Sequence, residues 1–411
     1  MTAPVGRHRI DALTGLRFVA AAVVAVEHFP EMIPGLDPSD AAQGGAGVSL
    51  FFVLSGFVLV HTYGELLAVR SDERPVRQFS LARFARITPL HLVALAIVAP
   101  LVIALRNPLL DHTAGAVGLG LLANIFLVHA WFPFQAFNLW NGPAWSISVE
   151  AFFYATFPFL VPLIVWPIMR RRWVGRAIAT IIMVQVAAFL VVSIVAGSFL
   201  LDRSGDVEGT RLIMGRLANI PAMRLGEFLI GCLLGAAYRA EYRRIGFVGW
   251  RWLEDARVRS ALLIGAVAAV IAIQFTSACP AAVCYPGATN ARALVDLRLF
   301  VAYLPVVVVI IAAVAWGPSP ISRALSTRTM VRLGEVSFAF YILQWAAWLV
   351  INSSSSSPTQ FEAIMAVLVT LALSFLAYRW VEVPARHAIV RRWAPRTTSA
   401  NAVAALPTES S

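Results

Sequence analysis

The feature that most constrains this chain is a series of apolar runs, each long enough to cross a lipid bilayer. Ten are predicted, at residues 12–30, 46–63, 87–105, 143–167, 177–199, 218–238, 259–277, 298–316, 333–351 and 361–381. Hydrophobic residues fill 59% of the 411 positions and charged residues only 13%, whereas soluble domains carry about 25% charged residues. The expected fold class is an all-α polytopic membrane protein with about ten transmembrane helices.

The basic residues are all arginines, and their positions predict how the chain is oriented. Arginine clusters lie within 70–86, 170–176, 239–259, 323–332 and 386–396, and the net charge is +11. With ten crossings and a cytoplasmic N-terminus, every cluster falls on the cytoplasmic side. We therefore expect a transmembrane domain at 1–390 in the cell membrane, a disordered cytoplasmic tail at 391–411, and no nucleic-acid partner.

Residues 115–132 form an eleventh apolar segment that is rich in glycine. Counting it as a crossing would place the cluster at 170–176 outside the cell. We therefore expect this segment to be re-entrant or to lie along the outer interface, where protein must cover its backbone.

The chain has three cysteines and no predicted metal site. Cys232 lies in an apolar run. Cys279 and Cys284 share a predicted outer loop, where a disulfide and a free pair both remain open.

The first apolar run holds two ionisable side chains that are predicted to share a helix face. Arg17 and His28 are eleven residues apart, which brings them to within roughly 20° on a helix and separates them by roughly 16 Å. Ala20, Ala21 and Val24 lie between them and are small enough to leave room for a ligand. Ionisable groups inside a membrane are costly, so this pattern indicates a functional site.

Four motifs, in order along the chain, resemble those of the acyltransferase 3 family of integral membrane acyltransferases. They are Asp11-Ala-Leu-Thr-Gly-Leu-Arg17 with His28; Gly47-Val-Ser-Leu-Phe-Phe-Val-Leu-Ser55-Gly56-Phe57; Arg83-Phe-Ala-Arg86-Ile-Thr-Pro89; and Trp145-Ser146-Ile-Ser148-Val-Glu150-Ala-Phe-Phe-Tyr154. Weaker likenesses lie around Arg224 and Glu227 and at Glu382-Val-Pro384. A late segment, from Gly334 to Gln344, resembles a family helix in which a histidine often stands where this chain has Gln344.

The resemblance implies an enzyme that moves an acyl group, most simply acetyl, from a cytoplasmic acyl-CoA to a hydroxyl. The implied acceptors are carbohydrates, peptidoglycan, glycolipids or macrolides. Acyl-CoA (acetyl-CoA) would be a co-substrate, and no bound cofactor is expected. Either the membrane domain acylates the acceptor directly, or a separate extracytoplasmic partner completes the transfer.

Two sets of polar residues are the candidates for this chemistry. His28 could take a proton from the attacking hydroxyl, although a histidine packed at the membrane interface is the alternative. Arg17, Arg83 and Arg86 are predicted near the cytoplasmic end, where guanidinium groups suit the phosphates of coenzyme A. Membrane anchoring is the alternative for Arg83 and Arg86, whereas Arg17 lies deeper in its helix and is harder to explain as an anchor.

Glu150 interrupts an apolar run, so it is expected to be either paired or functional. It could orient His28 or position the acceptor hydroxyl. Ser146, four residues earlier, shares its face, with helix capping as the alternative. We assign Ser146, Trp145 and Gln344 to substrate binding.

Ser55 is interpreted as a packing residue, with a catalytic role as the alternative, and Arg224 with Glu227 as a structural ion pair. A transporter or flippase for a glycan or an acylated small molecule is the alternative function, because it too needs polar residues inside the membrane. Broken helices in two matching halves would favour it, and the sequence does not show them.

Overall fold

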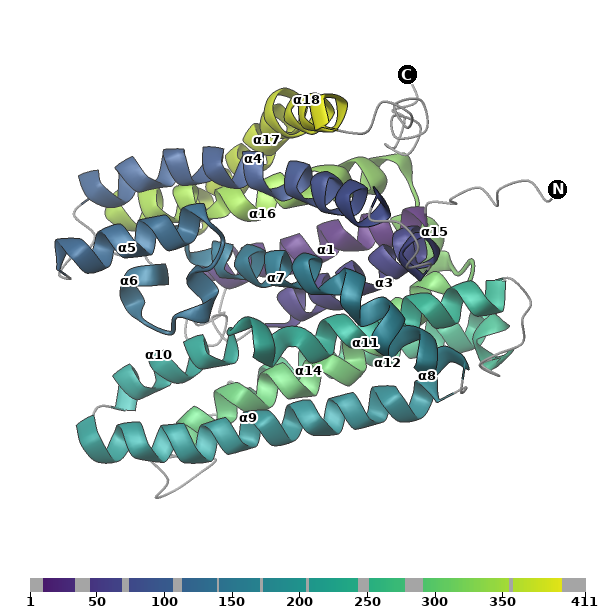
Figure 1. Cartoon of the computed structure of the whole chain (residues 1–411). Coiled ribbons are helices and arrows are strands. Elements are labelled where there is room, and N and C mark those ends of the chain that lie inside the picture. Colours follow the sequence, from purple (N-terminus) through teal and green to yellow (C-terminus); the bar gives the residue numbers. More distant parts are fainter. Residues whose placement is uncertain are drawn as a thin grey trace.

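The computed structural model of the chain is a bundle of helices (Figure 1). It describes residues 10–33, 45–68, 74–105, 113–138, 140–170, 173–204, 207–242, 251–277, 291–354 and 358–393, and no strand occurs in these ranges. Every predicted apolar run falls on a helix, which confirms the all-α polytopic fold class. Seven of the described helical stretches are long and apolar enough to cross a membrane. The number of crossings, predicted as ten, stays a prediction.

Four helices form the centre of the bundle, and they pack in two pairs. They are α1 (Asp11–His28), α3 (Ala46–Ala68), α11 (Pro221–Tyr242) and α16 (Arg328–Ser354). Helix α3 lies along α11, and α1 lies along α16 and also contacts α3. In Figure 1, α1 and α3 run through the middle of the molecule.

Glycines bring the backbones of α3 and α11 into direct contact. A Cβ atom added to Gly231 would lie 2.0 Å from the carbonyl oxygen of Val53, and one added to Gly56 would lie 2.2 Å from that of Phe228. Only a residue without a side chain permits so close an approach, which is the usual way for membrane helices to pack tightly. This contact fixes α3, the helix that carries Ser55.

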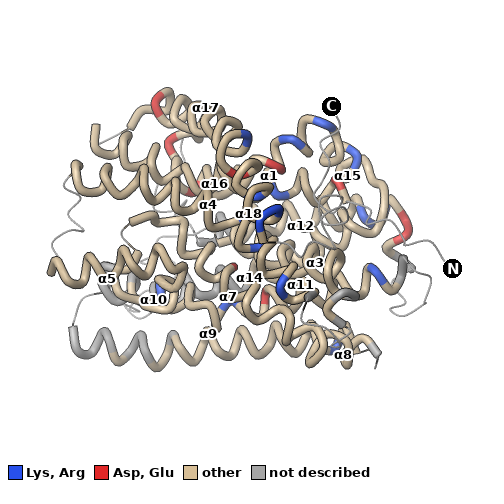
Figure 2. The backbone as a smooth tube through the Cα atoms, turned by 45° about the horizontal axis from the view of Figure 1, so that its top comes forward, with Lys and Arg blue, Asp and Glu red and all other residues tan. Residues whose placement is uncertain are grey.

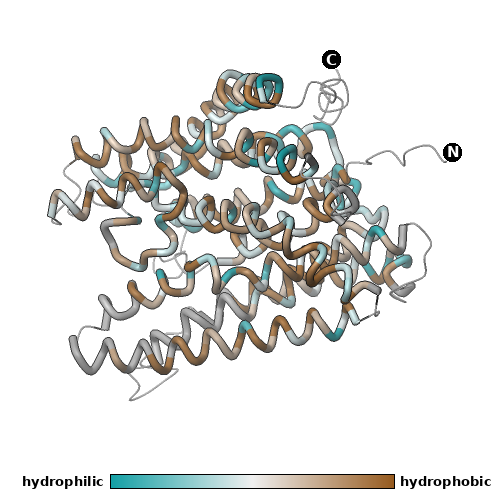
Figure 3. Tube along the Cα trace, viewed as in Figure 1, coloured by the Kyte–Doolittle hydropathy of each residue, from teal (hydrophilic) through white to brown (hydrophobic). Residues whose placement is uncertain are grey.

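The peripheral helices expose apolar side chains. They include α4 (Arg74–Ala104), α9 (Val174–Ser204), α12 (Ala256–Ser277) and α17 (Gln360–Ala377). Large exposed side chains such as Ile103, Met183 and Ile264 point outward from three of them. Brown segments run along α4 and α9 in Figure 3, as a lipid-facing surface requires.

The remaining helices complete the bundle around this centre. They are α7 (Trp145–Leu160), α8 (Trp166–Arg170), α10 (Val207–Ala218), α14 (Ala291–Ala315), α15 (Pro320–Leu325) and α18 (Val383–Trp393). A π-helical turn (Val161–Val165) joins α7 to α8, and a second one (Tyr378–Glu382) joins α17 to α18. Helix α10 was not predicted. Helix α18 includes the first residues of the predicted tail, and the rest of that tail lies outside the described residues.

The segment predicted to be re-entrant contains a short helix, α5 (Ala114–Ile125). Twelve residues of helix are about 18 Å long, well short of a hydrocarbon core of about 30 Å. Ser148 on α7 holds the chain that follows, because its Oγ donates to the Leu127 carbonyl at 2.7 Å. The segment is therefore too short to cross by itself, and its depth in the membrane stays a prediction.

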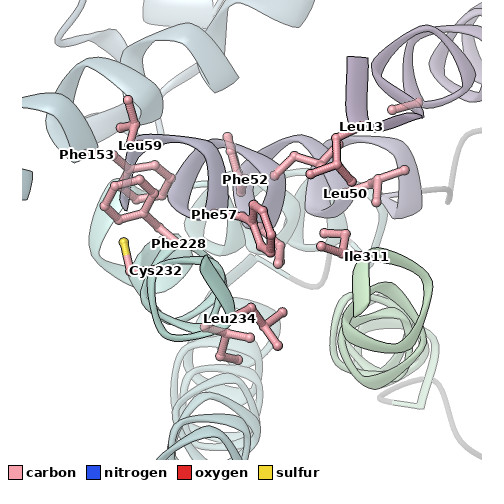
Figure 4. Packing of buried hydrophobic residues seen from close by; sticks show 14 of the residues in the cluster. Leu13, Leu50, Phe52, Phe57, Leu59, Phe153, Phe228, Cys232, Leu234 and Ile311 are labelled. Atoms are coloured by element: carbon pink, nitrogen blue, oxygen red, sulfur yellow. The ribbon is translucent and has the colours of Figure 1, made fainter. Parts of the chain in front are cut away.

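Aromatic residues fill the core where α3, α7 and α11 meet. The rings of Phe153 and Phe228 stack with their centroids 4.6 Å apart, and Cys232 lies beside them as a buried free thiol (Figure 4). The predicted pair of Cys279 and Cys284 lies outside the described residues.

Charged residues are unevenly distributed over the bundle. In Figure 2 much of the blue gathers around α1, α15 and α18, whereas α5 carries no charged residue. This asymmetry is the pattern that the positive-inside rule associates with a cytoplasmic end.

Candidate active site

A polar pocket opens between helices α1, α3, α4, α7 and α16. It holds about 730 Å³ of empty space, part of it open to solvent. The polar side chains that line it are Arg17, Ser55, Arg83, Arg86, Ser146, Glu150, Tyr154, Ser337 and Tyr341. Five of the eight residues predicted for the site therefore come together here: the three arginines, Ser146 and Glu150.

The three arginines reach the pocket from two helices. Arg83 donates from Nη2 to the Tyr63 hydroxyl at 3.1 Å, and its guanidinium lies over the Tyr154 ring at 5.8 Å. Arg17 and Arg86 make no side-chain hydrogen bond or ion pair with any described residue. Two guanidinium groups thus face the pocket with their donors available for a ligand. Such groups suit the paired oxygens of a phosphate.

Glu150 is held by two hydroxyl groups. Ser55 Oγ donates to Glu150 Oε1 at 3.0 Å, and the Tyr154 hydroxyl donates to the same oxygen. Tyr154 lies one helical turn beyond Glu150 on α7, and Ser55 comes from α3. The hydrogen bonds of Glu150 are therefore with these two residues and not with His28.

Ser146 and Tyr341 form a second polar contact in the pocket. Their hydroxyl oxygens are 2.8 Å apart, and both groups also bond the carbonyl of Pro143, at 3.0 and 2.9 Å. Ser146 does not cap α7, because the helix begins at Trp145 and its N-cap residue, Ala144, makes no side-chain capping bond. Its hydroxyl is instead part of the contact between α7 and α16.

His28 and Gln344 form a pair that does not line the pocket. His28 Nδ1 lies 3.1 Å from Gln344 Oε1, and Gln344 Nε2 donates to the Ala21 carbonyl at 3.4 Å. Gln344 stands three residues after Tyr341 on α16. One turn of helix therefore connects this pair to the end of the pocket that Ser146 and Tyr341 line.

Trp145 lies away from the pocket. Its ring packs edge-on against Phe52 at 6.0 Å, and the guanidinium of Arg224 lies over it at 5.5 Å. Arg224 and Glu227 are both fully buried and form an ion pair of 2.8 Å, which confirms the predicted structural pair. In this structure Trp145 covers that pair.

The small residues between Arg17 and His28 do not border an open channel, so this interpretation was wrong. Ala20 and Ala21 are completely buried, and Val24 is 2% exposed. A Cβ atom on Gly47 of α3 would lie 2.7 Å from both the Ala20 carbonyl and a Val24 methyl group. The small side chains serve close helix packing, and Arg17 is the only residue of α1 that lines the pocket.

The sequence analysis missed the parts that Ser55, Tyr154 and Tyr341 play in this pocket. Tyr154 follows Ser146 and Glu150 at the same four-residue interval, which was a readable signal. Tyr341 stands in the quoted late segment, but its partner Ser146 is 195 residues away. Among the described residues no cluster of side chains suits a metal ion.

Comparison with known proteins identifies the family to which the chain belongs. The profile of the acyltransferase 3 family, described as an acyltransferase domain, matches residues 10–379. The chain belongs to the acyltransferase 3 family. It is therefore an enzyme that transfers acyl groups, and the transporter alternative loses its support.

Curated relatives agree with this assignment. The chain is 29% identical to acyltransferase MdmB of Streptomyces mycarofaciens over 349 residues, which cover 82% of this chain and 78% of that protein. It is 24% identical to peptidoglycan O-acetyltransferase OatA of Listeria monocytogenes over 92% of this chain, but spans only 56% of that protein. Exopolysaccharide production protein ExoZ of Rhizobium meliloti is 29% identical over 47% of this chain and 57% of its own length. No solved structure matches the chain.

Proposed function

We propose that this acyltransferase moves an acyl group, most simply acetyl, from acyl-CoA to a hydroxyl group of a carbohydrate, glycolipid or macrolide-type acceptor. One observation carries the proposal. Arg17, Arg83 and Arg86 enter the same pocket as the hydroxyl and carboxylate groups of Ser55, Glu150 and Ser146. Guanidinium groups suit an anionic donor, and hydroxyl and carboxylate groups suit an alcohol acceptor.

The donor would be bound by its phosphates. Coenzyme A carries a pyrophosphate and a 3′-phosphate, and bidentate guanidinium contacts are the strongest that side chains offer to such groups. Arg17 and Arg86, whose guanidinium groups make no hydrogen bond or ion pair with a described residue, would receive them. The protein would lie in the plasma membrane with both termini cytoplasmic, so that the arginines face the compartment that supplies acyl-CoA.

The acceptor end would lie beyond Ser146 and Tyr341, toward His28. A neutral imidazole there could take the proton of the acceptor hydroxyl as the ester forms. The names of OatA and ExoZ associate those relatives with peptidoglycan and exopolysaccharide, which supports a carbohydrate acceptor. A separate extracytoplasmic partner could deliver the acceptor or receive the product.

The test is release of free CoA thiol by the purified protein with acetyl-CoA and a panel of glycan and macrolide acceptors. We expect acceptor-dependent release by the wild type and its loss in His28→Ala. His387→Ala, which removes an exposed histidine on α18, is the matched control. Equal release by the wild type and His28→Ala would remove His28 from the mechanism. A protein that does not bind acetyl-CoA at all would refute the assigned donor.

A further inference from the structure

Ser55 is placed as a nucleophile would be. It lies on α3, lines the pocket, is 9% exposed, and donates its hydroxyl to Glu150 Oε1 at 3.0 Å. Tyr154 bonds the same oxygen and so fixes the carboxylate. A hydroxyl, a base within hydrogen-bond reach, and a third group that orients the base are the recurring parts of covalent catalysis.

A second serine on α3 shows what a structural role looks like. Ser49 also donates to a carboxylate, at 3.3 Å, but its partner Glu227 is already paired with Arg224 and all of these groups are fully buried. Glu150 has no ion-pair partner within 4.0 Å among the described residues, and it lines a pocket. Glu150 is thus open to the pocket beside Ser55, whereas Glu227 is enclosed together with its counter-charge.

Close helix packing does not need the Ser55 hydroxyl. The neighbouring residue, Gly56, makes the backbone contact with α11, where an added Cβ atom would lie 2.2 Å from the Phe228 carbonyl. Ser55 faces α7 and the pocket instead. The side chain is thus aimed at the site where the proposed function puts the donor.

Because His28 lies outside the pocket, a group inside the pocket is needed to attack the acyl donor. His28 does not line the pocket that holds the arginines, so an acyl group held there is out of direct contact with it. A carrier within the pocket would separate attack on the donor from transfer to the acceptor. Guanidinium groups in the same pocket could stabilise the oxyanion that forms during attack.

From these observations, and resting on the proposed function, we infer that Ser55 carries the acyl group covalently between donor and acceptor. Ser55 Oγ bonds to the thioester carbonyl carbon and passes its proton to Glu150, the C–S bond breaks, and the thiolate takes that proton to leave as free CoA. The acceptor oxygen then bonds to the acyl carbon as His28 takes its proton, the C–Oγ bond breaks, and that proton is returned to Ser55 by way of Glu150.

The experiment measures exchange of labelled CoA into unlabelled acetyl-CoA by the purified full-length protein, with no acceptor present. A covalent carrier makes this exchange possible, whereas direct transfer does not. We expect exchange in the wild type, a loss of at least about 100-fold in Ser55→Ala and Glu150→Gln, and retention in Ser49→Ala. Acid quenching and peptide mass spectrometry should find an acetyl group on Ser55. Ser55→Cys should instead carry a thioester that neutral hydroxylamine cleaves.

Two results would overturn the inference. One is acceptor-dependent thiol release without CoA exchange, which would leave the proposed function intact and show direct transfer. The other is exchange that survives in a folded Ser55→Ala protein, with the acetyl group on a different residue. If the wild type neither exchanges CoA nor uses acetyl-CoA with any acceptor, the proposed function fails together with the inference.

Discussion

His28 on α1 donates its Nδ1 proton to Oε1 of Gln344 on α16 across 3.1 Å. A neutral imidazole with its proton on Nδ1 keeps a lone pair on Nε2, so this bond selects the tautomer that can act as a base there. Gln344 is itself held by the Ala21 carbonyl. The Gln344 amide thus contacts the imidazole of His28 directly.

Removing this orienting amide should slow catalysis without weakening donor binding. We expect Gln344→Ala to lower kcat by about 10-fold, because the His28 ring then loses its fixed tautomer, while KM for acyl-CoA stays close to that of the wild type. His28→Ala should cost about 10²- to 10⁴-fold, the usual contribution of a general base. Steady-state kinetics measure both. Asn352→Ala, which removes an exposed amide on the same helix, should leave both constants unchanged.

Replacing an arginine of the pocket should weaken binding of the acyl-CoA donor. We expect Arg86→Gln to raise KM for acyl-CoA by about 10-fold or more, since hydrogen bonds to charged groups contribute about 1.5–3 kcal/mol. Arg77→Gln neutralises an exposed arginine about two and a half turns earlier on α4 and serves as the control. A similar change in KM for both variants would point to general surface charge, and a fall in kcat alone would contradict phosphate binding by Arg86.

The glycine contact between α3 and α11 should be intolerant of even one methyl group. In Gly231→Ala the new Cβ atom would lie 2.0 Å from the Val53 carbonyl, so the helices have to separate. We expect a loss of about 1–3 kcal/mol and a lower Tm in detergent, the usual cost of overpacking. Gly265→Ala on α12 is the matched control, because an added Cβ meets nothing within 4 Å there. An equal Tm for the two variants would refute the close packing.

Loss of either partner of the buried ion pair should destabilise the protein. We expect Glu227→Gln to destabilise the protein by about 3–5 kcal/mol, because it leaves the Arg224 charge buried without its counter-charge. Thermal unfolding in detergent, followed by intrinsic fluorescence, measures the shift. Glu254→Gln, at a largely exposed carboxylate outside this pair, should leave Tm unchanged.

Much of the fold could be predicted because hydropathy reports which segments lipid surrounds. Hydropathy does not report where a helix begins or ends, because polar residues can extend a helix beyond its apolar run. The run predicted at 87–105 belongs to a helix that begins at Arg74, so more than three turns of helix, including Arg83 and Arg86, lie ahead of the apolar stretch. Helix α10 was missed because its composition is too polar to stand out as a crossing.

The site was predictable where its residues share a helix. Ser146 and Glu150 were placed together from their spacing, and the three arginines from their expected depth, and the structure brings all five to one pocket. Contacts between distant segments were beyond that reasoning. Nothing in the local pattern pairs His28 with Gln344, 316 residues later, or indicates that Trp145 would cover Arg224.

Helix α16 carries Tyr341 and Gln344 one turn apart, and so it holds both the far end of the pocket and the histidine at once. A helix moves as a rigid rod, and a shift of one residue along its axis is about 1.5 Å, enough to break both hydrogen bonds together. One helix therefore fixes both ends of the site relative to each other, and any displacement of α16 changes them together.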